Sequence, residues 1–245
     1  MAIPTITPYP MPREDEMPVN RVSWTPDARR AVLLVHDMQN YFVNAFAPGT
    51  SPIVELVSAI TGLRETAWRL GIPVVYSAQP GGQTSAQRGL LEDFWGAGVG
   101  ADPGAQEIVT ALTPGPADIR LTKWRYSAFH RTPLRELLAE QGRDQLIVTG
   151  IYAHIGCLMT ACDAFMGDVE VFFVADGVAD FSAEHHRMAQ TYAAERCAAV
   201  LAAVRVQRLL TASAAHAARG GGRVRRGRGG GPAPPRGGGG WTTGE

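Results

Sequence analysis

The sequence is poor in cysteine and lacks long apolar segments. Its three cysteines, Cys157, Cys162 and Cys197, cannot all pair with one another, and they show neither a CxxC motif nor the spacing of metal ligands. We therefore expect no disulfide framework and a reducing compartment. No run of about 18 apolar residues occurs, and the N-terminus has no basic region followed by an apolar stretch. The sequence thus predicts a cytoplasmic protein without a membrane partner.

The chain also lacks an overall excess of charge. Its formal net charge is zero, although six arginines and one glutamate give residues 219–245 a charge of +5 and leave −5 on residues 1–218. A folded part with this charge has no basic field that would attract nucleic acid. The length of 245 residues, 45% of them hydrophobic, is sufficient for one α/β domain with a sizeable core.

Three regions differ in composition. Residues 1–28 are rich in proline and show little periodicity, which indicates an extended arm that lies on another surface. Residues 29–210 contain nearly all of the apolar runs and form the predicted folded domain. In residues 211–245, glycine, arginine and proline replace the residues that form cores. Because such a segment cannot bury enough apolar area to offset its ordering entropy, we expect it to be disordered.

The folded domain alternates between short apolar runs and longer helix-like segments. The runs are continuous rather than alternating, as in parallel strands covered on both faces, and they span residues 31–36, 72–77, 119–122, 145–150 and 169–175. The helix-like segments span residues 52–70, 87–95, 103–112, 133–141, 155–167 and 182–202. This alternation predicts an α/β fold, a doubly wound, mostly parallel sheet with helices on both faces. Ligands of such sheets bind outside the carboxyl ends of the strands.

Two charged residues follow predicted strands at that edge. Asp37 comes directly after the first apolar run, and Lys123 comes after the third. From these features alone, Asp37 is equally well explained as a turn or helix-capping aspartate, and the pair as a structural ion pair. If Asp37 is an acid, desolvation should raise its pKa toward neutrality, whereas Lys123 would lower it. The acid role therefore requires desolvation, or a dianionic substrate, to outweigh the lysine.

A third signal is TGIYAHIGCLMTA at residues 149–161, where a strand leads into a helix whose backbone N–H groups can bind an oxyanion. Together with LLVHDMQNYF, SAQPGGQ, QRGLLEDFWG and LTKWRYSAFHRTPL, it resembles the isochorismatase-like superfamily from Met1 to about residue 203. Members of this superfamily carry an aspartate, a lysine and a nucleophilic cysteine. The cysteine position aligns with Gly156, and Cys157 lies one residue further along the helix, rotated by about 100°.

An aspartate and a lysine without the cysteine are typical of the isochorismatases proper. The resemblance implies a hydrolase domain at residues 29–210 that cleaves the enol-pyruvyl ether of isochorismate into pyruvate and 2,3-dihydro-2,3-dihydroxybenzoate for siderophore biosynthesis. It assigns Asp37 as the general acid, Lys123 as a stabiliser of charge, and Gly156 to the turn at the pyruvyl end. No metal, cofactor or covalent intermediate is expected, since protonation of the vinyl carbon lets water attack directly.

The same resemblance predicts the remaining site residues and partners. Substrate contacts are expected from Gln79, Arg88 and Tyr152, and apolar walls from Phe42, Trp95 and Tyr126. It also implies a cis peptide bond between Ile151 and Tyr152, and a homodimer whose arm lies across its partner. Because nothing in the chain resembles the aryl-carrier domain of many siderophore isochorismatases, a carrier protein as a partner would be a separate chain.

Other interpretations compete with this one. The same chemistry on the 2-amino analogue would serve phenazine biosynthesis, and a thiol amidohydrolase would use Cys157. The arginine- and glycine-rich tail resembles segments that bind single-stranded nucleic acid, but it holds one aromatic residue, Trp241, so we do not expect this function. A catalytically inactive scaffold protein would not need Asp37, Gln79, Arg88 and Lys123 together, so the presence of all four argues against this function. His185 and His186 are adjacent and would point to different sides of a helix, which argues against a zinc site.

Overall fold

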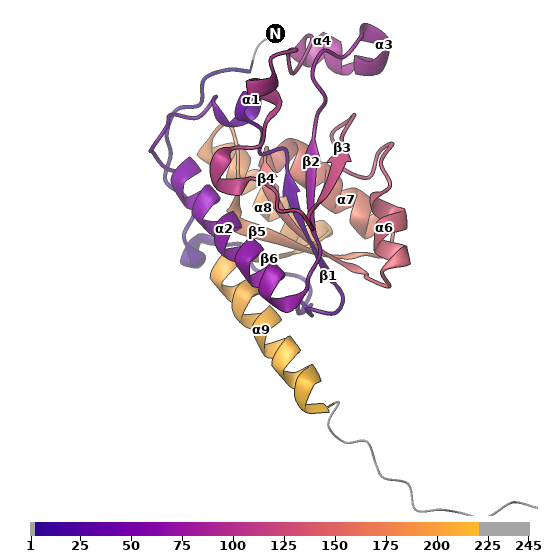
Figure 1. Cartoon of the computed structure of the whole chain (residues 1–245). Coiled ribbons are helices and arrows are strands. Elements are labelled where there is room, and N and C mark those ends of the chain that lie inside the picture. The colour runs from indigo at the N-terminus through magenta and orange to yellow at the C-terminus, as the bar shows by residue number, and fades with distance from the viewer. Residues whose placement is uncertain (1–2, 221–245) are drawn as a thin grey trace, which may run out of the picture.

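The fold is a parallel sheet between two layers of helices (Figure 1), and the computed structural model describes residues 3–220. Its six strands lie in the order β3-β2-β1-β4-β5-β6, and every neighbouring pair is parallel. The strands are β1 (Ala31–His36), β2 (Val74–Ala78), β3 (Ile119–Thr122), β4 (Gln145–Ile151), β5 (Glu170–Ala179) and β6 (Ala199–Leu201). The predicted doubly wound α/β fold is confirmed.

Apolar residues on both faces of the central strands explain this layering. In β1, Leu33 and Val35 pack into a core on one face, and Val32 and Leu34 pack into a second core on the other. The first core is covered by α2 (Ile53–Leu70) and α9 (Ala203–Gly220). The second is covered by α6 (Leu134–Glu140), α7 (Leu158–Met166) and α8 (Ala183–Arg196). A strand buried on both sides needs a continuous apolar run, which is what the sequence shows.

The strand order creates a crevice next to β1. The chain leaves β1 through α2 on one face to reach β2, whereas it returns through α6 on the other face to reach β4. Connections that leave neighbouring strands toward opposite faces leave a gap at the carboxyl ends of those strands. The ends of β1 and β4, at His36 and Ile151, are therefore the place where the fold offers room for a ligand.

Shorter helical segments lie between these longer elements of the chain. They are η1 (Glu14–Glu16), α1 (Asn40–Val43), α3 (Ser85–Arg88), α4 (Leu91–Trp95), α5 (Pro103–Gln106), η2 (Thr110–Leu112) and η3 (Ala153–Cys157). The helix predicted over 87–95 is divided in two, because Gly89 adopts φ 55°, a conformation outside the right-handed helical region. Within residues 3–220, no helix is both long and apolar enough to cross a membrane.

The C-terminal part of the domain differs from the sequence prediction. The helix predicted over 182–202 ends at Arg196, and Ala199–Leu201 form the edge strand β6 beside β5. The buried ladder outweighs the helix propensity of these alanine-rich residues. The last helix, α9, then continues to Gly220, past residue 211, where a disordered tail was predicted. Residues 221–245, which hold the rest of that tail, lie outside the described residues.

The N-terminal arm lies on its own chain. Ile6 is buried and donates its N–H to the carbonyl of Ala45 at 2.7 Å. Tyr9 is also buried, and its hydroxyl accepts the N–H of Asp180 at 2.8 Å. Near the end of the arm, Asn20 is bonded in both directions to the backbone of Val200 in β6. These contacts place the arm on the surface of its own domain.

Candidate active site

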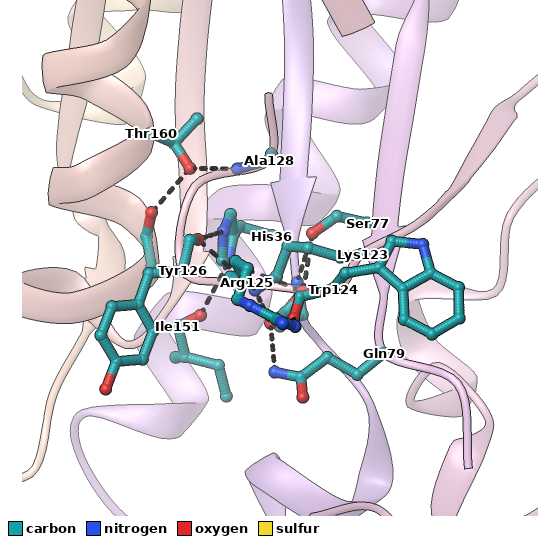
Figure 2. Close-up of polar contacts among 12 residues, drawn as sticks. His36, Ser77, Gln79, Lys123, Trp124, Arg125, Tyr126, Ala128, Ile151 and Thr160 are labelled. Carbon is teal, nitrogen blue, oxygen red and sulfur yellow. Dashed lines mark hydrogen bonds and ion pairs between the residues drawn. The ribbon is translucent and has the colours of Figure 1, made fainter. Parts of the chain in front are cut away.

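Asp37 and Lys123 meet at the carboxyl ends of the strands. Figure 2 shows Lys123 there, together with Ser77 and Gln79. The Lys123 Nζ lies 2.9 Å from Asp37 Oδ2, and the two residues are 1% and 4% exposed. The main chain of both residues extends the hydrogen bonding of the sheet, because the N–H of Asp37 donates to the carbonyl of Ser77 and the N–H of Lys123 donates to the carbonyl of Ala78. Strand order therefore brings together two residues that are 86 positions apart in the printed sequence. Lys123 is also the single lysine of the chain.

The Lys123 ammonium is held by three oxygen atoms. Besides Asp37, it donates to the carbonyl of Arg125 at 2.6 Å and to that of Tyr126 at 3.4 Å. An ammonium has three protons, so these acceptors use all of its donor capacity. A buried cation requires such partners because its transfer out of water is otherwise strongly unfavourable. The loop after β3 thus fixes the position of the charge.

The Asp37 carboxylate is aimed by the backbone and by two neighbours. Asp37 has φ 49°, in the left-handed region that residues other than glycine seldom adopt and where aspartate is tolerated best. Its Oδ1 accepts a hydrogen bond from the Ser77 hydroxyl at 2.7 Å, and its Oδ2 accepts one from the Gln79 amide at 3.3 Å. Backbone strain of this kind gathers at sites where the surrounding structure holds a side chain for function.

The electrostatics correct one expectation. Burial by itself would raise the pKa of Asp37, but the Lys123 ammonium and the hydrogen bond from Ser77 outweigh it, and the pKa lies below its ordinary value. The prediction of a raised pKa is therefore wrong for the site formed by the protein residues alone. Desolvation was expected to dominate, whereas the contact at 2.9 Å lets the positive charge dominate instead.

A cavity beside this pair is lined by every residue assigned to the site from the sequence. Those residues are Asp37, Phe42, Gln79, Arg88, Trp95, Lys123, Tyr126, Tyr152 and Gly156. Sequence reasoning missed Tyr41 and Leu91 in the lining, although Tyr41 is next to Phe42 and Leu91 lies between Arg88 and Trp95. It also missed Ile3 and Ile155, for which the sequence contains no comparable signal.

The polar end of the cavity is formed by Arg88 and Gln79. Arg88 is 4% exposed, its Nη1 donates to Gln79 Oε1 at 3.0 Å, and its Nε donates to the carbonyl of Gly96 at 2.9 Å. Burial lowers the pKa of this guanidinium, yet arginine keeps its charge at any ordinary pH. Through Gln79, the arginine and Asp37 belong to one hydrogen-bonded chain, which suits the binding of a carboxylate next to an acid.

Aromatic side chains form the apolar wall. Trp95 donates its indole N–H to the Tyr126 hydroxyl at 2.7 Å and stacks on Phe181. Phe181 in turn stacks on Tyr152 with ring centroids 4.2 Å apart. The Tyr152 hydroxyl donates to the carbonyl of Phe42 at 2.9 Å, which anchors this part of the wall. Phe181 is a further residue of this stack that sequence reasoning did not select.

Gly156 and His36 share one small volume. A Cβ added at Gly156 would overlap the His36 imidazole, so a side chain at this position has no room. The His36 Nδ1 lies 3.0 Å from the Ile151 carbonyl, and its Nε2 lies 3.3 Å from that of Tyr126. Burial lowers the pKa of His36 to about 4, which leaves the ring neutral near pH 7 with one proton. The shorter Nδ1 contact is then the hydrogen bond that the ring donates.

The turn after β4 differs from a simple anion cradle. Residues Ala153–Cys157 form a π-helical turn, and the peptide bond between Ile151 and Tyr152 is cis, as the resemblance indicated. The N–H groups of Ile155 and Cys157 donate to the Tyr152 carbonyl, and that of His154 donates to Asp180. Most of the N–H groups that we expected to receive an oxyanion are thus already occupied within the protein.

Cys157 does not line the cavity. Its residue is fully buried in the core on the α7 side of the sheet, where the thiol lies 4.0 Å from the Thr149 carbonyl. Burial raises the pKa of this thiol well above its ordinary value, so it stays protonated and is a poor nucleophile. The geometry therefore does not favour the amidohydrolase interpretation based on Cys157.

His154, His185 and His186 do not line the cavity that holds Asp37. His186 is buried against Tyr9 and the Ala175 carbonyl, whereas the exposed ring of His185 stacks on His154. Ligand atoms of His154, Asp180 and His185 come within 4.8 Å of one another. However, both Asp180 oxygens already accept hydrogen bonds, one of them from His154 Nδ1 at 2.7 Å. This cluster therefore serves to hold the turn after β4.

Comparisons with known proteins agree with the geometry. A family model described as the isochorismatase domain matches residues 31–204. The chain is 61% identical over 198 residues to the isochorismatase of Bacillus subtilis (strain 168), an alignment that covers 81% of this chain and 64% of that protein. It is 49% identical over 199 residues to the phenazine biosynthesis protein PhzD1 of Pseudomonas aeruginosa, covering 81% of this chain and 95% of that protein.

A solved structure extends the comparison to the fold. The cysteine hydrolase of Pseudomonas syringae pv. phaseolicola 1448A superposes with a TM-score of 0.70 at 23% identity, covering 80% of this chain and 98% of that one. At this identity the likeness concerns the fold alone. The chain spans less than two thirds of the length of the Bacillus relative, because the alignment covers 64% of that protein.

Proposed function

This chain belongs to the isochorismatase family, and on that basis we propose that it hydrolyses the enol-pyruvyl ether of isochorismate to pyruvate and 2,3-dihydro-2,3-dihydroxybenzoate. The observation that carries the proposal is the buried contact between Asp37 and Lys123 in a cavity that no cysteine lines. A carboxyl group can donate a proton to carbon, which is the chemistry that an enol ether requires. This reaction does not require a thiolate nucleophile.

The proton on Asp37 must arrive together with the substrate. With its lowered pKa, Asp37 is a carboxylate at neutral pH when only protein groups surround it. Isochorismate is a dianion, and its carboxylates would share Lys123 and Arg88 with Asp37. Additional negative charge in a dry site raises the pKa of a carboxyl group, so binding favours uptake of one proton. The substrate thereby creates the acid that acts on it.

The reaction then follows from the arrangement. Asp37 transfers its proton to the methylene carbon, and the C=C electron pair forms the new C–H bond, which leaves an oxocarbenium ion. Water adds to that cation and gives its proton to the Asp37 carboxylate. The resulting hemiketal breaks its C–O bond to the ring, releasing pyruvate and the ring alcohol. Lys123 stabilises negative charge throughout, since it is already fixed by two carbonyl groups.

Gln79 and Arg88 are proposed to orient the pyruvyl carboxylate. They form one hydrogen-bonded chain with Asp37 and would place the methylene carbon within reach of the acid. Phe42, Trp95, Tyr126 and Tyr152 would enclose the ring and exclude bulk water, and Gly156 would line the pyruvyl end. A water-poor wall strengthens the interaction between Lys123 and the developing charges.

An assay of pyruvate release tests the proposal. Isochorismate is supplied to the full chain, and pyruvate is measured through lactate dehydrogenase. We expect turnover in the unmodified chain and a loss of about 10³-fold or more in Asp37→Asn, which keeps the shape but cannot cycle a proton. Binding of substrate by Asp37→Asn should persist. Turnover of isochorismate that is unchanged in Asp37→Asn would reject the assignment.

A second candidate substrate is the 2-amino analogue of isochorismate. It is favoured by the 49% identity to a phenazine biosynthesis protein over 95% of that protein's length. The same acid would cleave the same ether, so the two candidates differ in the contact at ring position 2. The 2-hydroxyl substrate would serve catecholate siderophore synthesis, and the 2-amino substrate would serve phenazine synthesis. The ratio of kcat/KM values for the two compounds decides between them.

We also infer a cytoplasmic location, a homodimer and, for the siderophore route, a separate aryl-carrier protein as partner. Free cysteines in residues 3–220 support a reducing compartment. Exposed apolar side chains on neighbouring helices, Phe165 on α7 and Tyr192 on α8, support a contact between subunits. Light scattering coupled to gel filtration would show a mass near twice 26.2 kDa for a dimer. A monomer at micromolar concentration would contradict this inference.

A further inference from the structure

Two cysteines away from the Asp37 cavity lie close together. Cys162 is in the middle of α7, and Cys197 ends α8 as its C-terminal cap. Their sulfur atoms are 3.8 Å apart, although the residues are separated by 35 positions. Both are free thiols, Cys162 is partly exposed and Cys197 is buried. Neither of them lines the cavity that holds Asp37.

This pair needs little movement to become a disulfide. The bond requires the sulfur atoms to approach from 3.8 Å to about 2.05 Å. Cys197 has φ −149° and lies at the end of its helix, so its backbone is not confined within a helical turn. The two helices that would be joined already pack against each other. The fold thus places the two thiols next to each other on two helices that pack together.

The two thiols also differ in reactivity. The hydrogen bond with Cys197 lowers the pKa of Cys162 to about 7, so the Cys162 thiolate forms more readily than that of an ordinary thiol. Burial and the same hydrogen bond keep Cys197 protonated, because they raise its pKa. A partly exposed thiolate beside a second thiol has the features of an attacking sulfur with a resolving partner. Cys157, fully buried with a raised pKa, lacks these features.

We propose that Cys162 and Cys197 are a peroxide-sensitive dithiol that closes to an intramolecular disulfide. The Cys162 thiolate attacks one oxygen of hydrogen peroxide, the O–O bond breaks, and the released hydroxide takes up a proton to become water. The Cys162 sulfenic acid is then attacked by the Cys197 sulfur, which forms the S–S bond. The sulfenic oxygen leaves as a second water with the remaining protons. The two sulfurs lose two electrons, and peroxide gains them.

The test is a peptide map of the full chain after treatment with hydrogen peroxide at neutral pH. We expect the intact mass to fall by about 2 Da, from loss of two hydrogens, and a peptide pair joined through Cys162 and Cys197 under non-reducing conditions. Dithiothreitol should restore both thiols. The rate of closure should rise with pH through the region near pH 7, where Cys162 ionises. Pyruvate release by the reduced chain is measured in parallel and is independent of this result.

Matched variants identify the sulfurs. Cys157→Ala should form the disulfide as the unmodified chain does, whereas Cys162→Ala and Cys197→Ala should not. In Cys197→Ala, Cys162 should react with peroxide more slowly, because the hydrogen bond that lowers its pKa is lost. Any sulfenic acid that forms on Cys162 then has no resolving thiol and should react with dimedone. The proposal is overturned if peroxide leaves both thiols of the folded, unmodified chain free, takes Cys162 to a sulfinic acid without an S–S bond, or links two chains instead. These readouts on the unmodified chain do not depend on how well any variant folds.

Discussion

The imidazole of His36 fills the space that a side chain at Gly156 would need. The two residues come from different strands, since His36 ends β1 and Gly156 lies in the turn after β4. In the resemblance described above, position 156 aligns with a cysteine nucleophile. The neutral ring therefore excludes that group from the cavity while it hydrogen-bonds the carbonyl of Ile151. The lack of a cysteine at position 156 is thus explained by the neighbouring His36 ring, which leaves no space for a side chain there.

Adding a methyl group at position 156 tests this relationship. Gly156→Ala should displace His36 and destabilise the protein by about 1–3 kcal/mol, as overpacking of a closed site does. Pyruvate release should fall at least about tenfold, because the Tyr126 carbonyl that binds Lys123 is also next to His36. Urea unfolding and the coupled assay measure the two effects. The double variant His36→Ala/Gly156→Ala should recover part of the stability. If the loss of stability in the double variant equals the sum of the losses in the two single variants, the two residues do not compete for one volume.

The pH dependence of catalysis follows from the lowered pKa of Asp37. Because this carboxyl is ionised in the protein alone, and the productive complex holds one more proton, kcat/KM should fall as pH rises. We expect a decrease of about tenfold per pH unit between pH 6 and 8. The kcat at saturation should be flatter, since bound substrate retains the proton. A kcat/KM that rises over this interval would contradict uptake of a proton by Asp37.

Proton uptake can also be measured without turnover. The analogue in which the enol-pyruvyl group is reduced to a lactyl ether keeps both carboxylates but has no vinyl carbon to protonate. Calorimetric titration in buffers of different ionisation enthalpy should show uptake of about one proton at pH 7. The control variant Asp37→Asn should bind with uptake near zero. Equal uptake by both proteins would place the proton on another group.

Replacement of Cys157 separates acid catalysis from thiol catalysis. Cys157→Ala should leave kcat/KM for pyruvate release within about twofold of the unmodified chain. Unfolding should become easier by about 1 kcal/mol, because a small apolar side chain is lost from a full core. Iodoacetamide should not inactivate the folded enzyme through this residue, whose thiol is buried and protonated. Loss of turnover in Cys157→Ala at full folding would restore the amidohydrolase interpretation.

The single lysine gives a direct spectroscopic view of the site. A protein grown with lysine labelled at Nζ should show one ammonium signal, and that signal should move when the lactyl analogue binds. It should also move in Asp37→Asn, whose amide no longer carries the charge 2.9 Å away. Lys123→Met should reduce kcat/KM by at least about 10²-fold, because it removes a preorganised positive charge. A lysine signal at the same chemical shift in the unmodified chain and in Asp37→Asn would contradict the ion pair.

Truncation tests the boundary of the folded domain. Residues 211–219 continue α9, and the Ser213 hydroxyl accepts the N–H of Ala28 at 3.0 Å. A chain ending after residue 210 should therefore melt about 2–4 °C below a chain ending after residue 220, for a loss of about 1 kcal/mol. Melting is followed by circular dichroism at equal protein concentration. Equal melting temperatures would support the earlier boundary at residue 211.

Most of the sheet could be predicted because its central strands are runs of buried apolar residues. The run at residues 31–36 coincides with β1, and that at 119–122 coincides with β3. The short edge strand β6 escaped prediction, since Ala199–Leu201 read as the continuation of an alanine-rich helix. Only the pairing of these residues with β5 makes them a strand rather than part of a helix. Similarly, the length of α9 depends on contacts with α2 that local composition does not reveal.

The sequence by itself determined which residues could do chemistry: a carboxyl after one buried strand, an amine after another, and glycine in the turn after a third. Residue types and their places along strands carry that information directly. Only the tertiary structure decided the protonation of Asp37 and the exclusion of Cys157 from the cavity. Both depend on separations of a few ångströms between groups from different strands. Coulombic and steric effects vary steeply over such separations, which follow from packing rather than from position in the chain.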